Sequence, residues 1–67
     1  MLIQDKLTGR EYVINLHQIR YIDYLKNDDG EFLTIYFDRT PFVFNNEQIN
    51  VRAIYDHLTR EIQSLKY

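Results

Sequence analysis

The chain has 67 residues, with ten acidic and eight basic side chains, six tyrosines, four phenylalanines and no cysteine. This length argues for a single domain spanning residues 1–67, and the absence of cysteine excludes a disulfide framework and a thiolate site. A net charge of −2 lacks the basic excess that is typical of proteins binding nucleic-acid phosphates.

No apolar run reaches the ~20 residues that a membrane-spanning helix needs. The segment Met1–Lys6 lacks the apolar core and the small-residue cleavage site of a signal peptide. We therefore expect the protein to be cytoplasmic and to have no membrane partner.

Turn residues divide the first part of the chain into short strands. Leu7–Arg10 predicts a turn between the apolar start and the run Glu11–Ile14. Leu16–Ile19 predicts a short connecting turn, and Arg20–Lys26 has the Ile, Tyr and Leu content of a strand.

The segment Asn27–Gly30 predicts a hairpin, because Gly30 can adopt the positive φ that such turns require. The runs Glu31–Phe37 and Phe42–Phe44 then form further strands. Pro41 has no backbone N–H to donate, so it favours the first position of a strand or a strand at an edge.

The last part of the chain has the period of a helix. Its apolar residues recur every three or four positions, at Val51, Ile54, Tyr55, Leu58, Ile62 and Leu65. Asn50 is a suitable N-cap, since its side-chain oxygen can accept from an amide two or three residues on. Arg52, Asp56 and Arg60 are spaced four apart and can form ion pairs on the exposed side.

These elements predict an α+β domain, a small antiparallel meander of about five strands with one C-terminal helix packed on one face. Leu33, Ile35 and Phe37 alternate onto one side of their strand, and we expect this apolar side to lie under the helix. Phe32 and Tyr36 then lie on the opposite face, which no element of the chain is left to cover.

The register of the preceding strand depends on the hairpin loop, because a slip of one residue moves every side chain to the other face. A four-residue loop places Ile22 and Tyr24 with the core, and Tyr21, Asp23 and Leu25 outside. A three-residue loop with a bulge reverses this and places outside the set Arg20, Ile22, Tyr24 and Lys26. We favour the first arrangement because it keeps Asp23 out of the core.

The candidate partner-binding residues are Phe32, Tyr36, Tyr21, Tyr24, Arg20 and Lys26. Tyrosine is typical of binding surfaces, but cross-strand aromatic pairs also stabilise ordinary sheets. Self-association and a different protein partner both remain open. In the bulged register, Arg20, Tyr24 and Lys26 would combine cations with an aromatic ring, as proteins that stack single-stranded bases do, although the neighbouring acidic residues oppose binding of phosphate.

The residues of common catalytic and metal sites are sparse. His17 and His57 have no partner at ligand spacing, and Ser64 is the only serine. Gly9 and Gly30 are single glycines in turns, so they form no phosphate-binding loop. We expect no enzyme activity, no catalytic residue, no metal and no cofactor.

Two segments resemble a known family. The segment 7–15 (LTGREYVIN) and the segment 18–23 (QIRYID) resemble the small FlbD-like flagellar and swarming-motility proteins, which implies short strands, a hairpin and a terminal helix. The stretch 14–37 also resembles the sheet of LytTR-type DNA-binding domains. The basic loops of those domains are missing here, and neither resemblance assigns a functional residue.

Together these observations predict a small non-enzymatic binding or regulatory module from a bacterium or a phage. We expect it to act by protein contacts at the open aromatic face, for example as an adaptor or inhibitor that occludes a partner. A nucleic-acid-binding regulator and a homo-oligomeric structural accessory protein, such as a homodimer, are the alternatives.

Overall fold

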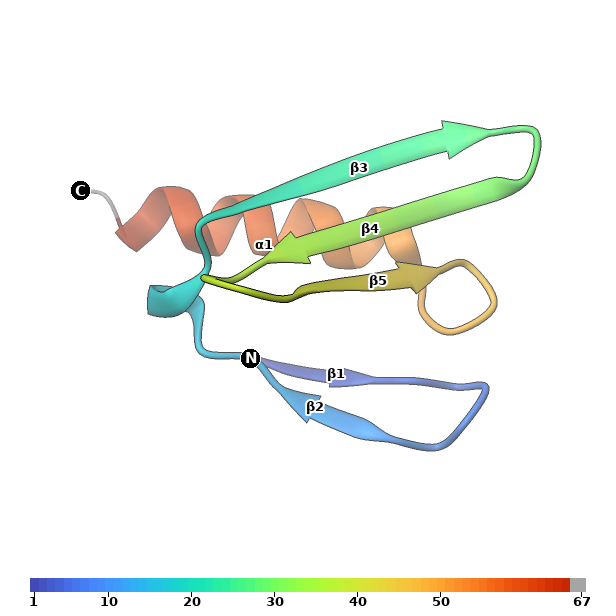
Figure 1. Cartoon of the computed structure of the whole chain (residues 1–67), viewed down its shortest axis with the longest axis horizontal. Coiled ribbons are helices and arrows are strands. Elements are labelled where there is room, and N and C mark those ends of the chain that lie inside the picture. Colours follow the sequence, from blue (N-terminus) through green and yellow to red (C-terminus); the bar gives the residue numbers. More distant parts are fainter. Residues whose placement is uncertain (66–67) are drawn as a thin grey trace.

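A computed structural model describes residues 1–65 of the chain and shows an α+β domain (Figure 1). Its strands are β1 (Leu2–Gln4), β2 (Glu11–Val13), β3 (Tyr21–Asn27), β4 (Gly30–Tyr36) and β5 (Pro41–Asn45). A short 3-10 turn, η1 (Leu16–Gln18), follows β2, and the helix α1 (Val51–Leu65) follows β5. The predicted class, the C-terminal helix and the connecting turn are confirmed.

The five strands form two sheets, so the prediction of one continuous meander is wrong. β1 pairs antiparallel with β2, while a separate antiparallel sheet has the order β3-β4-β5. The chain leaves the first sheet at η1, where the Asn15 side-chain oxygen accepts a hydrogen bond from the His17 N–H at 3.1 Å. This local turn redirects the chain between β2 and β3, so the two strands do not become neighbours.

The hairpin between β3 and β4 has the register that we favoured from the sequence. Pairing runs without a bulge from Tyr21 opposite Tyr36 to Asn27 opposite Gly30. The predicted four-residue loop ends at the pair Lys26–Glu31, but the ladder also includes the pair Asn27–Gly30. The loop therefore consists of Asp28 and Asp29 alone, and each side chain keeps the face that the four-residue loop predicts. The bulged alternative is therefore wrong.

Backbone chemistry explains where β4 and β5 begin. Gly30 has a φ of +130°, which a residue with a side chain adopts only under strain. The Asn27 side-chain oxygen accepts from the Asp29 N–H at 2.8 Å and supports the tight loop. On the other side of β4, Pro41 is the first residue of the edge strand β5, as its missing N–H predicts.

The helix α1 begins where the sequence predicts it. The side-chain oxygen of Asn50 accepts from the Ala53 N–H at 3.3 Å, which confirms the N-cap. Arg52 and Asp56 form an ion pair at 3.2 Å on the exposed side. Asp56 forms no second ion pair with Arg60 among residues 1–65.

A single core lies between α1 and the sheets. Its buried apolar residues are Ile3, Ile14, Leu33, Ile35, Phe44, Ile49, Val51 and Leu58. Ile22, Tyr24 and Phe37 are partly buried and pack against this core. The expectation that Leu33 and Ile35 lie under the helix is therefore confirmed. Phe37 follows the end of β4, and its ring contacts Phe42 of β5 edge-on.

A buried carboxylate ties the β1–β2 hairpin to the rest of the domain. Asp5 accepts hydrogen bonds from the N–H groups of Leu7 (2.8 Å) and Thr8 (3.2 Å) and from Nε2 of Gln48 (2.8 Å). Burial raises the pKa of Asp5, but these hydrogen bonds outweigh it, and the pKa lies below its ordinary value. The Lys6 N–H also donates to the Gln48 carbonyl at 2.7 Å, so the two segments are joined at two points.

Candidate functional site: the open sheet face

Within residues 1–65, no other element lies in front of one face of the β3-β4-β5 sheet. In Figure 1 this face is turned toward the viewer, α1 lies behind the sheet, and the β1–β2 hairpin lies beside β5. Pairing and alternation assign to this open face the residues Tyr21, Asp23, Leu25, Phe32, Thr34, Tyr36, Pro41, Val43 and Asn45.

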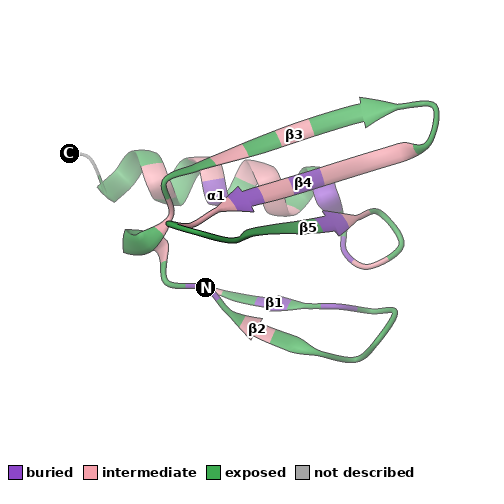
Figure 2. Cartoon of the chain, viewed as in Figure 1, coloured by how far each residue is buried: buried purple, intermediate pink, exposed green. Residues whose placement is uncertain are grey.

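The open face exposes unusually large apolar side chains. Tyr21 is 58% exposed, Leu25 is 49% exposed and Val43 is 57% exposed. Phe32 and Tyr36 are partly exposed, and neither belongs to the core or packs against it. Figure 2 shows the same distribution, with the larger part of β5 exposed and most of β4 intermediate. The sheet therefore buries its helix side and leaves an apolar side uncovered.

Two rings on this face hold each other in place. Tyr21 and Tyr36 occupy opposite positions on β3 and β4, and their rings stack with centroids 4.1 Å apart and an interplanar angle of 20°. A cross-strand aromatic pair restricts both side chains before any partner arrives. This reduces the entropy that a partner would have to overcome on binding.

Asp23 is the only charged residue among those assigned to the open face. It lies opposite Thr34, between the aromatic pair and the Leu25–Phe32 pair. Among these strand residues a single carboxylate lies beside exposed aromatic and aliphatic side chains, and a carboxylate repels phosphate.

The predicted site residues do not all lie on this face. Phe32, Tyr36 and Tyr21 are brought together there, but Tyr24 and Lys26 lie on the helix side of the sheet. Arg20 precedes β3 and is exposed. The interleaved set of Arg20, Tyr24 and Lys26 that favoured single-stranded nucleic acid is therefore not a joint surface, because it required the bulged register.

Tyr24 has a structural environment instead. Its hydroxyl donates to Oε1 of Glu31 at 2.6 Å, and its ring stacks on Tyr55 of α1 with centroids 5.2 Å apart. The Arg52 guanidinium lies over both rings, at 5.1 Å from Tyr24 and 5.5 Å from Tyr55. The hydrogen bond to Glu31 and burial raise the pKa of Tyr24. This cluster fastens the helix to β3.

Two exposed residues of this surface, Leu25 and Val43, are not among the partner-binding residues predicted from the sequence. Leu25 follows from the favoured register, since it alternates with Tyr21 and Asp23. Val43 lies opposite Thr34 on β5, and the sequence pattern Phe42-Val43-Phe44 carries that information only when the pairing of β5 with β4 is known.

The two histidines of the chain lie on η1 and α1. No group of three or more His, Asp or Glu residues there is placed to hold a metal ion. His57 lies beside Glu61 on α1 with Nε2 and Oε1 3.9 Å apart, and both side chains are about half exposed.

The fold and this surface define a small α+β domain with one uncovered apolar sheet face. No family model, no curated protein and no solved structure matches the chain. The resemblances to FlbD-like proteins and to the LytTR sheet accordingly stay predictions. Within residues 1–65, no helix has the length and apolar character needed to cross a bilayer.

Proposed function

We propose that this domain is a non-enzymatic protein-binding module that acts through its open sheet face. The observation that carries the proposal is the exposure of Tyr21, Leu25 and Val43 on one side of a sheet whose other side is packed. Apolar side chains that gather on one face favour an interaction site, because their exposure to water costs free energy that a partner can recover.

The mode of action is occlusion or adaptation. The open sheet face presents exposed apolar side chains, so we expect the effect on a partner to come from covering that partner's surface. Phe32 and Tyr36 lie centrally on this face because β4 is the middle strand of the sheet. Central aromatic residues commonly dominate the binding energy of an interface.

A direct test compares two valine-to-lysine variants. Val43→Lys places a charge on the open face, whereas Val13→Lys places the same charge on β2 of the other sheet, at a position that is 84% exposed. The tagged full chain and both variants are used to isolate partners from the native host. We expect Val13→Lys to retain a stoichiometric protein partner and Val43→Lys to lose it.

The strength of the contact is then measured with the purified partner. We expect Phe32→Ala and Tyr36→Ala each to weaken binding by more than ~1 kcal/mol, with far-ultraviolet circular dichroism unchanged. A partner that both lysine variants retain equally would contradict the proposal. A native mass of a dimer that only Val43→Lys dissociates would assign the face to self-association instead.

A further inference from the structure

A second feature, which shares Tyr21 with the open face, is the outer edge of β3. The strand order β3-β4-β5 leaves one side of β3 without a neighbouring strand in residues 1–65. β3 has seven residues, contains no proline, and pairs with β4 without a bulge. Natural edge strands of this length are usually shortened, bulged or covered, because their free N–H and C=O groups accept another strand.

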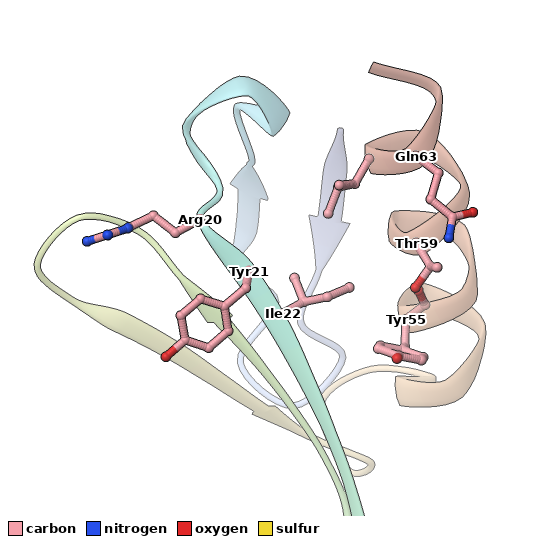
Figure 3. Close-up of a pocket in the computed structure, with 7 residues that line it drawn as sticks. Arg20, Tyr21, Ile22, Tyr55, Thr59 and Gln63 are labelled. Carbon is pink, nitrogen blue, oxygen red and sulfur yellow. The ribbon is translucent and has the colours of Figure 1, made fainter. Parts of the chain in front are cut away.

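A groove runs beside this edge, between the start of β3 and α1. It has a volume of about 240 Å³ and is lined by Arg20, Tyr21, Ile22, Tyr55, Thr59, Ile62 and Gln63. In Figure 3 Ile22 points from the strand toward the helix, where Tyr55, Thr59 and Gln63 form the opposite wall. The volume is below the range of typical small-molecule sites, and it suits one or two apolar side chains of a longer ligand.

Arg20 defines the chemistry at the end of the groove. Its side chain extends away from α1, on the same side of the strand as Tyr21 (Figure 3). Arg20 is exposed and forms no ion pair with an acidic side chain of residues 1–65. An added strand would place alternate side chains on the two sides of β3, so one residue would enter the groove and the next would approach Arg20.

We propose that the β3 edge and this groove bind an extended peptide segment of a partner protein by strand addition. The segment carries an apolar residue that enters the groove beside Ile22 and Ile62, and an adjacent acidic residue that pairs with Arg20. Main-chain hydrogen bonds to β3 hold the segment, and the groove and Arg20 select its sequence.

An acidic residue of the peptide supplies the charge partner that Arg20 lacks among the acidic side chains of residues 1–65. A second copy of this chain bound through β3 would instead give a dimer, so the native mass of the free chain separates the two occupants. A dimer that both Arg20→Glu and Thr59→Phe dissociate would overturn the peptide proposal.

The test is a selection from a displayed library of random octapeptides on the full chain. We expect enriched peptides to contain an apolar residue next to Asp or Glu. Arg20→Glu should weaken the chosen synthetic peptide about fivefold, since exposed ion pairs are weak, and should shift a repeated selection toward Lys and Arg. Thr59→Phe fills the groove from the helix side and should abolish binding, while Val43→Lys should leave it unchanged.

Amide hydrogen exchange locates the contact. We expect the peptide to slow exchange at β3 amides and to leave the β1–β2 hairpin unaffected, and N-methylation of alternate peptide residues to abolish binding. No enrichment over the unselected library would overturn the proposal. Enriched peptides that are insensitive to both Arg20→Glu and Thr59→Phe would overturn it too, and sensitivity to Val43→Lys alone would assign them to the open face.

Discussion

Replacing Gly30 with alanine tests how the β3–β4 hairpin is joined to the loop after β5. Gly30 has a φ of +130°, and a Cβ atom added there would lie 2.5 Å from Oδ1 of Asn46. The same oxygen accepts a hydrogen bond from the Glu31 N–H at 3.1 Å. The Asn46 side chain can rotate away from the new methyl group, but only by giving up this hydrogen bond.

The magnitude follows from these two effects. A residue with a side chain in a disfavoured backbone region costs about 1–3 kcal/mol, and the lost hydrogen bond costs about 1 kcal/mol. The alanine recovers about 0.5 kcal/mol by reducing the freedom of the unfolded chain. We therefore expect Gly30→Ala to lower the free energy of unfolding by about 1.5–3.5 kcal/mol.

Gly9→Ala is the matched control for backbone strain. Gly9 also has a positive φ, +79°, but a Cβ atom there would have no heavy atom within 4 Å. Its cost is limited to the left-handed backbone and should be about 1 kcal/mol. Asn46→Ala removes the hydrogen bond alone, so Gly30→Ala should be about 1 kcal/mol less costly in that background.

Urea unfolding followed by circular dichroism measures the unchanged chain, the three single variants and the Gly30→Ala/Asn46→Ala double variant. Equal m values are needed for a clean comparison of free energies. Two results would contradict a steric conflict between residue 30 and Asn46. One is a loss of unfolding free energy in Gly30→Ala no greater than that in Gly9→Ala. The other is an equal loss with and without the Asn46 side chain.

Two further predictions concern the core and its buried carboxylate. Leu58→Ala should lower the free energy of unfolding by about 2–5 kcal/mol, because Leu58 is fully buried. Its control, Leu65→Ala, lies at a position that is 46% exposed and should change the free energy of unfolding by about 0.5 kcal/mol or less. Similar urea midpoints for the two variants would contradict the packing of α1 against the core. The folded-state pKa of Asp5 is lowered, so its contribution to stability is present above the ordinary aspartate pKa of about 3.9 and is lost as the pH falls through the lower folded value. Asp5→Asn removes the carboxylate and can place an amide N–H opposite Nε2 of Gln48, so it should reduce the Tm at pH 7. It should also flatten the fall in Tm between pH 5 and 2 to roughly the slope set by the remaining carboxylates. An unchanged acid profile would show that Asp5 does not contribute to the pH dependence of stability.

The strand alternation, the helix and its cap could all be predicted from the sequence, because they depend on neighbours within a few residues. The spacing of Val51, Leu58 and Ile62 specifies a helix face, and Asn50 specifies its start. The separation of the open face from the core also followed from alternation in β4, where Leu33 and Ile35 face one way and Phe32 and Tyr36 the other.

The tertiary structure decided the features that depend on pairing between distant segments. The split into two sheets follows from the turn at η1, which separates β2 from β3. The residues of η1 predict a turn, but they do not indicate which strand β2 will pair with. The exposure of Val43 requires the pairing of β5 with β4, and the groove beside β3 requires the placement of α1 over Ile22. Local chemistry sets the direction of each side chain relative to its strand, whereas only the packed domain determines which of those directions still meets water.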